Sequence, residues 1–555
     1  MRRTSLRSKP WQYRGALLIT LLAWPVAAPA AEITVTATAA KPPAEAPALE
    51  MKDDAVQLSL DQAVTIALQQ NLGLVIERYT RTQQRLGLFQ SLGIYDLLAN
   101  ANASVSNSKF PAGVSQIQGT GSNNRTFDFS FAQTIPTGGN VSLGWSNSRD
   151  ESSSPFRAGL SYSSSYTFSY NQPLLRNFGR LATEHNILVA RTNSQLSRQE
   201  FERQVTATVQ QVENAYWTLV GAREQLVVAQ QSLGLAKELH ERNRIQVEVG
   251  TMAPLELTQS QAAIASREEG IIRATSAIGD AEDQLRLLLN LPAGGDLWQK
   301  AIMPTTPSET EHAAINVAEA IATAYAERPE LRTEELRVAQ AEIDARFFRN
   351  QLWPDLGLRV TYGFAGASAL LVSSTGQVLN VPAFNDALQQ ALRRDFPSWS
   401  AALVFAYPLQ NRAARAQSAI ANLDVERFET ELAQQKATIA TEVRRAARAV
   451  ETAAKQIEAA RVAREFQEKN LEAERKRYEN GMSTSFQITQ IQDQVTQARS
   501  DEVTATITYR TALAEYYRAI GRLLEQQGVA IDDPEEPDYA SSRFSFRRAP
   551  LPGEK

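Results

Sequence analysis

Two stretches of the sequence, residues 180–249 and 413–480, contain no proline and almost no glycine. Proline and glycine are the residues that most often interrupt helices, so each stretch predicts one continuous helix. At 1.5 Å per residue, such a helix is about 100 Å long. A compact globular domain has no use for helices of this length, and the sequence therefore predicts a structure built on two long rods.

Each predicted rod ends at a glycine and is followed by a second helix that runs back. The turns lie at Gly250 and Gly481, and the returning helices are expected over residues 255–291 and 486–524. The first residues of the two returning helices align as LELTQSQ and FQITQIQ. Alanine and valine recur at helical spacing in the rods, as in Val443, Ala447 and Val450, which suits close packing of helices. We infer two helical hairpins that arose by duplication.

The duplication extends to the segments before the rods. Residues 58–98 and 315–353 both read as largely helical, with Pro329 expected to break and restart the second segment, and strand-like residues follow each of them at 94–97 and 353–356. We therefore divide the chain into repeat 1 (58–300) and repeat 2 (301–526). Residues 31–57 are predicted to be a disordered linker and residues 527–555 a disordered C-terminal tail, since both are rich in residues typical of unpacked chain.

The strand segments alternate apolar and polar residues with a period of two. In repeat 1, Ala101, Ala103 and Val105 alternate with asparagine and serine. Repeat 2 follows the same pattern with two apolar series, which are Leu356, Leu358, Val360, Tyr362 and Phe364, and Trp399, Leu403 and Phe405. Such strands fit either a barrel with lipid outside and water inside or a soluble sandwich with packed apolar faces. The N-terminal segment and the long rods favour the barrel.

The N-terminal segment has the organisation of a secretory signal peptide. Basic residues precede an apolar run of about ten residues, roughly half of what a membrane-spanning helix needs, and small residues follow at 28–30. We therefore predict a signal peptide over residues 1–30. No later apolar run is long enough to span a bilayer as a helix, so entry into a membrane would require strands of a closed barrel.

Several classes of function are disfavoured by composition. The chain has no cysteine, which excludes disulfides, thiolate metal sites and lipid attachment. A net charge of −4 with interspersed signs gives no indication of nucleic-acid binding, and the three histidines His185, His240 and His312 lie far apart. No nucleophile motif or phosphate-binding loop is present, so we expect neither an enzyme nor a bound cofactor or metal.

The chain resembles the TolC family of outer-membrane efflux proteins. The order of helix, strands and helical hairpin occurs twice in the chain, as in this family. The resemblance also rests on the two glycine turns and on residues 172–180 (QPLLRNFGR), with a weaker second copy at 407–412 (YPLQNR). It implies an α+β membrane protein in which a homotrimer forms a twelve-stranded antiparallel β-barrel, with four strands per protomer, continuous with a long periplasmic α-helical barrel built from two internal repeats. It also implies location in the outer membrane of a Gram-negative bacterium, in contact with outer-membrane lipid.

The function implied by the resemblance is passive conduction in a tripartite export or efflux system. The other parts would be a periplasmic adaptor (membrane fusion) protein and an inner-membrane pump or ATPase. In this family the hairpin tips dock the adaptor, and the matching residues are Val249, Gly250, Thr251, Met252, Gly481, Met482, Ser483 and Thr484. The alternative for these residues is turn chemistry alone, because glycine is needed for a left-handed backbone whether or not a partner binds.

The resemblance also implies a gate at the periplasmic entrance, which family members build with acidic residues. Here the matching positions are Gln487 and Gln490, with Asp493 further along and Glu256 on the first hairpin. Gln487 and Gln490 are expected on the side of their helix opposite Phe486, Ile488 and Ile491. A ring of amides constricts by size and hydrogen bonding rather than by negative potential.

Two questions stay open at the level of sequence. Repeat 1 carries an additional strand-like hairpin near residues 125–148, which either extends the barrel wall or folds over its mouth. The second question is function, since a structural coiled-coil protein of the cell envelope that conducts nothing is the alternative to a channel. The sequence does not identify the cargo.

Overall fold

The computed structural model describes residues 51–52, 55–109, 111, 120–153, 159–291, 296–307, 315–372 and 377–531. The predicted signal peptide, His312 and most of the predicted linker and tail lie outside these residues. The described elements belong to one unit that starts at Leu49. Among the helices that the structure describes, none combines the length and the apolar character needed to cross a bilayer.

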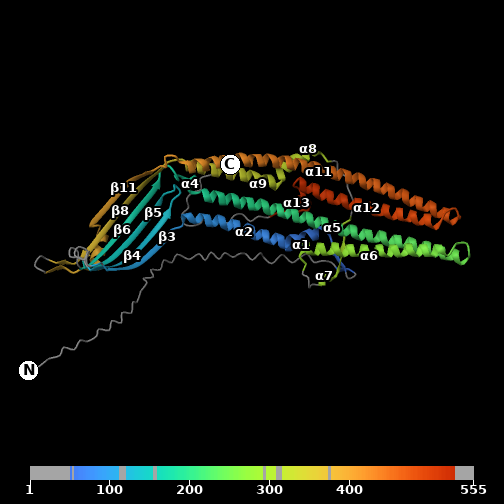
Figure 1. The fold of residues 1–555 in the computed structure, drawn as a ribbon, viewed down its shortest axis with the longest axis horizontal. Helices are drawn as coiled ribbons and strands as arrows, with labels where there is room; N and C mark the ends of the chain where they lie inside the picture. Colours follow the sequence, from blue (N-terminus) through green and yellow to red (C-terminus); the bar gives the residue numbers. More distant parts are fainter. Residues whose placement is uncertain are drawn as a thin grey trace, which may run out of the picture. The chain divides into compact units, whose positions relative to one another are not determined.

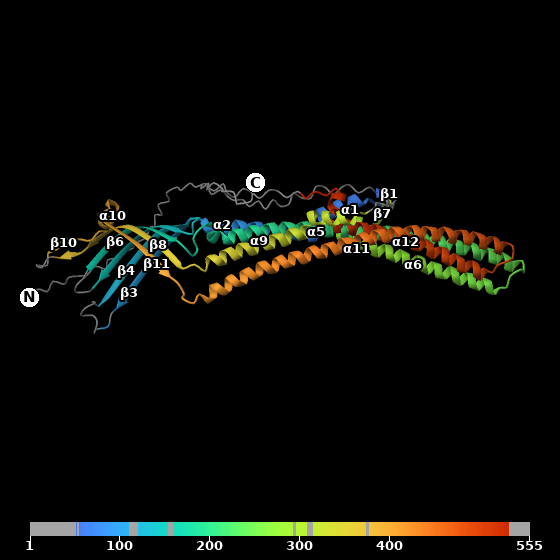
Figure 2. The ribbon, with the colours of Figure 1, turned by 90° about the horizontal axis from the view of Figure 1, so that it is seen from above.

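Four long helices form two hairpins (Figures 1 and 2). The first pairs α5 (His185–Glu248) with α6 (Leu255–Leu289), and the second pairs α11 (Arg412–Glu479) with α12 (Ser485–Ala519). The rods of 64 and 68 residues confirm the helix prediction. A short helix α4 (Arg180–Thr183) precedes α5, and α13 (Leu523–Gln526) follows α12.

Shorter helices precede the strands in both halves. They are α1 (Leu60–Gln70) and α2 (Leu72–Leu92) in the first half, and α8 (Val317–Glu327) and α9 (Pro329–Asn350) in the second. Ser59 and Gln62 form a capping box that starts α1, and Pro329 begins α9 as predicted. The strand predicted at residues 94–97 is wrong: Gly93–Tyr95 forms a 3₁₀ turn, η1, and the strand starts at Leu98.

Six strands form one antiparallel sheet in the order β11-β8-β6-β5-β4-β3. Four come from the first half, namely β3 (Leu98–Lys109), β4 (Gly121–Thr134), β5 (Asn140–Ser152) and β6 (Gly159–Pro173). Two come from the second half, namely β8 (Asp355–Ala369) and β11 (Phe396–Ala406). The sheet therefore has six strands in one chain, where the resemblance implied four barrel strands per protomer, because β4 and β5 lie between β3 and β6 as full-length members of the sheet.

The register gives the sheet two unlike faces, as the alternation predicted. One tier of the apolar face runs across five strands, from Ala101 on β3 through Phe129, Trp145 and Tyr166 to Phe364 on β8. The opposite face carries hydroxyls that bond between strands, with Ser104 Oγ 2.7 Å from Thr126 Oγ1 and Ser148 Oγ 2.8 Å from Ser163 Oγ.

The apolar face is open to solvent in the single chain over most of its area. Trp399, Leu403 and Phe405 on β11 are 78%, 68% and 65% exposed. In a soluble sandwich a second sheet would cover these side chains. The only other sheets among the described residues are small: β9 (Leu371–Val372) pairs with β10 (Val378–Asn380), and β1 (Met51–Lys52), β2 (Ala55–Leu58) and β7 (Ala301–Pro304) form the other.

One short helix, α10 (Phe384–Arg393), covers part of this face. Ala387 and Ala391 of α10 are fully buried over Gly366 of β8. A Cβ at position 366 would lie 2.0 Å from the carbonyl oxygen of Ala387, so only glycine lets the helix approach this closely.

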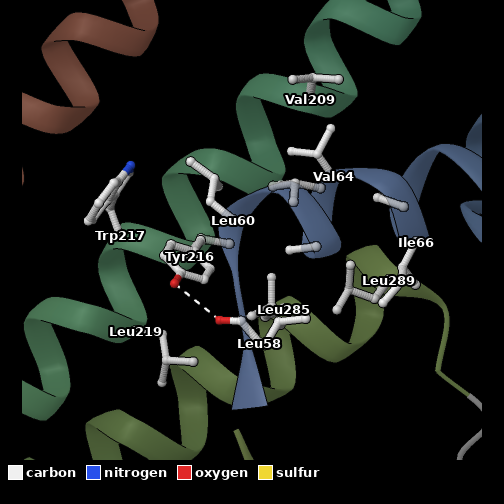
Figure 3. Packing of buried hydrophobic residues seen from close by; sticks show 14 of the residues in the cluster. Leu58, Leu60, Val64, Ile66, Val209, Tyr216, Trp217, Leu219, Leu285 and Leu289 are labelled. Atoms are coloured by element: carbon white, nitrogen blue, oxygen red, sulfur yellow. Dashed lines mark hydrogen bonds between the residues drawn. The ribbon is translucent and has the colours of Figure 1, made fainter. Parts of the chain in front are cut away.

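The main hydrophobic core lies where α1, β2, β7 and α6 pack on the middle of α5 (Figure 3). Tyr216 and Trp217 of α5 are its largest fully buried side chains, and the Tyr216 hydroxyl donates to the carbonyl oxygen of Leu58 at 3.2 Å. The small helix α7 (Asp296–Gln299) precedes β7. Residues 55–57 of the predicted linker belong to β2, with Val56 buried, because β2 pairs in parallel with β7.

Candidate functional site

The two hairpin turns have the same backbone geometry. Gly250 and Gly481 adopt left-handed φ angles of 78° and 72°. In each turn the glycine N–H donates three residues back, and the next N–H donates five residues back, from Thr251 to Gln246 at 2.9 Å and from Met482 to Arg477 at 2.8 Å. This is the Schellman arrangement that ends helices at glycine. Turn chemistry alone thus accounts for both glycines.

A buried hydrogen-bond network joins the two tips. Asn243 of α5 is 0% exposed, donates to Ser485 Oγ at 2.8 Å and accepts from the Tyr478 hydroxyl at 2.6 Å. Tyr478 and Ser485 belong to the second hairpin and are also buried. Buried polar groups are costly to leave unpaired, so this network holds the two tips in one relative position.

Apolar and charged contacts support the same junction. Leu239, Tyr478 and Ile488 form a small buried cluster, against which Met252 packs. Outside it, the Arg242 guanidinium bonds to Glu479 of the other hairpin at 2.7 Å. The two tips, which carry the eight predicted residues, therefore lie side by side. The Met252 side chain is partly buried by contacts within the chain.

The exposed apolar side chains at the tips form a surface that we call the tip patch. Its members are Val249, Leu255, Met482 and Phe486, which are 70%, 64%, 70% and 68% exposed. Sequence reasoning missed Leu255 and Phe486 as tip residues. Both lie in the first turn of a returning helix, and a large apolar residue at this aligned position was the available signal.

Two of the predicted gate residues lie on an exposed side of α12. Gln487 and Gln490 are exposed, whereas Ile488 and Ile491 are buried against the neighbouring helices. The expectation that Phe486 shares the packed side is wrong. At 100° per residue, Phe486 lies within about 40° of Gln490 and on the far side from Ile488.

The two carboxylates proposed beside the gate have different surroundings. Asp493 accepts a 2.6 Å bond from the Arg267 guanidinium of α6, and Arg267 is itself 10% exposed. The Glu256 carboxylate lies close enough to Tyr478 to raise the pKa of its hydroxyl, with burial as the larger cause. Among the described residues, no group of three histidine or acidic side chains is placed to hold a metal ion.

Comparisons with known proteins agree with this geometry. The family model of the outer membrane efflux proteins matches residues 138–291 and 320–522. Curated protein sequences provide no match. Among solved structures, the chain is similar to the CmeC outer membrane channel of Campylobacter jejuni, with a TM-score of 0.61, 15% identity, and coverage of 84% of this chain and 86% of CmeC.

Two further structures show the same fold. The MtrE outer membrane channel of Neisseria gonorrhoeae, solved in its open state, has a TM-score of 0.58, 17% identity, and coverage of 84% of this chain and 89% of MtrE. The outer membrane protein VceC of Vibrio cholerae has a TM-score of 0.59, 13% identity, and coverage of 83% of this chain and 96% of VceC. The two matched segments of the family model span more than half of the sequence, and the chain belongs to the outer membrane efflux protein family.

Proposed function

We propose that three copies of this chain form a passive conduit across the outer membrane in a tripartite export system. The observation that carries the proposal is the sheet with one apolar and one hydroxyl-rich face. Lipid tolerates no unpaired backbone groups, so a sheet with such faces enters a membrane only when its edges are closed. In the described structure β3 and β11 each pair on one side only, and copies of the chain would close the ring.

The direction and energy of transport are assigned to partners. Family membership supports a periplasmic adaptor and an inner-membrane pump or ATPase as those partners. We assign adaptor docking to the hairpin tips, because the tip patch exposes four large apolar side chains on a junction that is internally rigid. Gln487, Gln490, Asp493 and Glu256 are assigned to the entrance of the closed tunnel.

Single-channel recording of the purified protein in a planar bilayer tests the conduit. Discrete conductance steps are expected, and they should increase when the tips are loosened by Asn243→Ala, which removes both bonds that Asn243 makes across the hairpins. The matched control is Asn480→Ala, since the Asn480 side chain bonds only within its own helix end, to the carbonyl oxygen of Lys476. A correctly folded protein that gives no conductance would instead support the structural coiled-coil alternative.

A further inference from the structure

We propose that the β4–β5 hairpin is a wall segment that widens the barrel, so that a closed trimer has eighteen strands, three copies of six, rather than twelve. The inference rests on the trimer of the proposed function. It answers whether this hairpin extends the wall or folds over the mouth, and it concerns the width of the duct.

The pairing of β4 and β5 is continuous along their length. β4 pairs with β3 from Gly121 to Ala132, and β5 pairs with β6 from Asn140 to Ser152, with no break in register. A hairpin folded over a pore would have to give up one of these ladders. Instead, β4 keeps its pairing with β3 and β5 keeps its pairing with β6. A strand in a barrel wall requires such backbone pairing on both sides.

Aromatic side chains on the hairpin continue the apolar face of the neighbouring strand β6. Trp145 stacks on Tyr166 of β6 at 5.9 Å between ring centroids, and Phe127 meets Trp145 edge to face at 6.1 Å. The Trp145 indole N–H is bonded to Ser164 Oγ at 3.1 Å. Large rings at matched levels are what a lipid-facing wall presents, and a hairpin lying in a water-filled mouth would gain nothing from them.

The two edges of the six-stranded sheet are complementary. The six strands alternate in direction across the sheet, so the two edge strands, β3 and β11, run in opposite directions. The apolar face of β3 carries the small residues Ala99, Ala101 and Ala103. On the same face, β11 exposes three bulky side chains, namely Trp399, Leu403 and Phe405. Small side chains on β3 leave room for the large side chains on β11, so β11 of one copy can pair with β3 of the next.

The additional strands change the width of the duct. With strands about 4.8 Å apart and tilted by about 40°, a barrel of eighteen strands has a backbone diameter of about 36 Å, against about 24 Å for twelve. The hairpin therefore makes the barrel about half as wide again. The barrel then accommodates bulkier cargo than a twelve-stranded one.

The structure also shows how to remove the hairpin. The hydroxyls of Thr120 and Ser153, just outside β4 and β5, are 3.0 Å apart, so deletion of residues 121–152 joins ends that already meet. Pairing through β4 and β5 places Ala101 at the level of Tyr166, and both lie on the apolar face. After the deletion, β3 can pair with β6, and the apolar residues of both strands remain on the apolar face of the sheet.

Cysteine pairs distinguish the two arrangements, because the chain has no cysteine of its own. In the full-length chain, the pair Ala101→Cys and Phe129→Cys should form a disulfide on oxidation, since these positions face each other on β3 and β4. The pair Ala101→Cys and Tyr166→Cys should not, since three strand spacings, about 14 Å, separate them. In the chain lacking residues 121–152, the second pair should cross-link.

Electron cryomicroscopy of the purified full-length protein gives the strand count. Eighteen strands around a three-fold axis are expected. A trimer with twelve wall strands, or cross-linking of positions 101 and 166 in the full-length chain, would overturn the inference and leave the proposed conduit standing. A monomer would overturn both the conduit and the eighteen-stranded barrel. Should the shortened chain fail to fold, the two cysteine pairs in the full-length chain still decide the question.

Discussion

A single contact changes the role that can be assigned to Asp493. Its position beside Gln487 and Gln490 makes it a candidate for an acidic gate, yet its carboxylate is bonded to Arg267 at 2.6 Å. A carboxylate paired in this way contributes little net negative potential to an opening. The uncharged character expected of the entrance therefore depends on Arg267, which no sequence motif singled out.

The first prediction concerns block of the channel by trivalent metal ions added on the tip side. Block of the unmodified channel should be slight, because the rings formed by Gln487 and Gln490 carry no charge. Aspartate at both positions should lower the blocking concentration by about tenfold or more, and added salt should reverse the effect through screening. Single-channel recording at two salt concentrations measures both effects.

Arg267→Gln is the companion variant to this test, since it frees the Asp493 carboxylate without touching the glutamines. It should strengthen block less than the double aspartate variant does. Tight block of the unmodified channel would contradict the assignment and would move the gate to Asp493 or Glu256.

The second prediction concerns Glu213, a buried carboxyl on α5 that accepts a 3.2 Å bond from Gln527. Burial raises its pKa to about 7. The folded chain therefore holds this proton more tightly than the unfolded chain, and the free energy of unfolding should fall as pH rises from about 4.5 to about 7, by roughly 3 kcal/mol. Glu213→Gln should remove this dependence and stabilise the protein above pH 7.

Helix unfolding followed by circular dichroism at about pH 5 and about pH 8 measures the effect of Glu213. Glu451→Gln is the control, because Glu451 lies on an exposed helix surface and bonds only to Lys455. The same pH dependence in the Glu213 variant and in the unmodified protein would rule the residue out as its source.

At the scale of elements, the backbone conformation of the hairpin turns determines where the tip patch lies. A Cβ at Gly250 or Gly481 would meet no atom within 4 Å, so a side chain there encounters no clash. Its cost is the left-handed backbone, about 1–2 kcal/mol for a residue with a Cβ. A β-branched residue should therefore distort the turn and move Met482 and Val249 of the tip patch, while the barrel strands are unaffected.

The third prediction follows from this cost. Gly250→Val or Gly481→Val should abolish export and leave the trimer intact, whereas Gly481→Asn should retain most export, because asparagine tolerates the left-handed region. Export by cells that carry the cognate pump and native gels of the purified variants measure the two properties. Loss of the trimer in the valine variants would mean that the glycines serve assembly rather than docking.

The fourth prediction concerns α10, whose close packing on β8 depends on Gly366. Gly366→Ala would place a Cβ 2.0 Å from the Ala387 carbonyl oxygen and 2.7 Å from the Ala391 amide nitrogen, so the helix has to move. We expect a loss of about 1–3 kcal/mol of stability and faster proteolysis of residues 384–393. Gly357→Ala, on the same strand, is the control, since its nearest neighbour would lie 4.0 Å away. Equal behaviour of both variants would contradict this account of the α10 contact.

At the scale of the whole molecule, the exposed apolar face and the two single-sided edge strands make the isolated chain incomplete. β3 is exposed along nearly its whole length, and β11 along all of it. Exposed apolar strands of this length at a sheet edge lead to aggregation unless they are paired. Association of identical copies pairs both edges, and the closed wall can then turn its apolar face to lipid.

The fifth prediction is therefore a trimer in the outer membrane. Native mass spectrometry from mild detergent should give three times the chain mass, and cell fractionation should recover the protein with the outer membrane. A monomeric mass, or recovery with the inner membrane, would contradict the proposed assembly.

Local sequence preferences account for much of what could be predicted. The absence of proline placed α5 and α11 to within a few residues, and the glycines placed both turns. The two-residue alternation separated the faces of β3, β8 and β11. Each of these features depends on residues close in the chain, whose backbone preferences are the same before and after folding. The side of α12 that carries Phe486 was predicted wrongly, because Phe486 was placed on one side with Ile488 and Ile491.

The sequence by itself therefore determined the type of each element, the turns and the two-faced character of the strands. Only the tertiary structure decided that the sheet has six strands, that Arg267 neutralises Asp493, and that Asn243 joins the two tips through Tyr478. These contacts join segments that are up to 235 residues apart in the chain. Their partners are chosen by the packing of whole helices and strands against one another, and no local pattern records that choice.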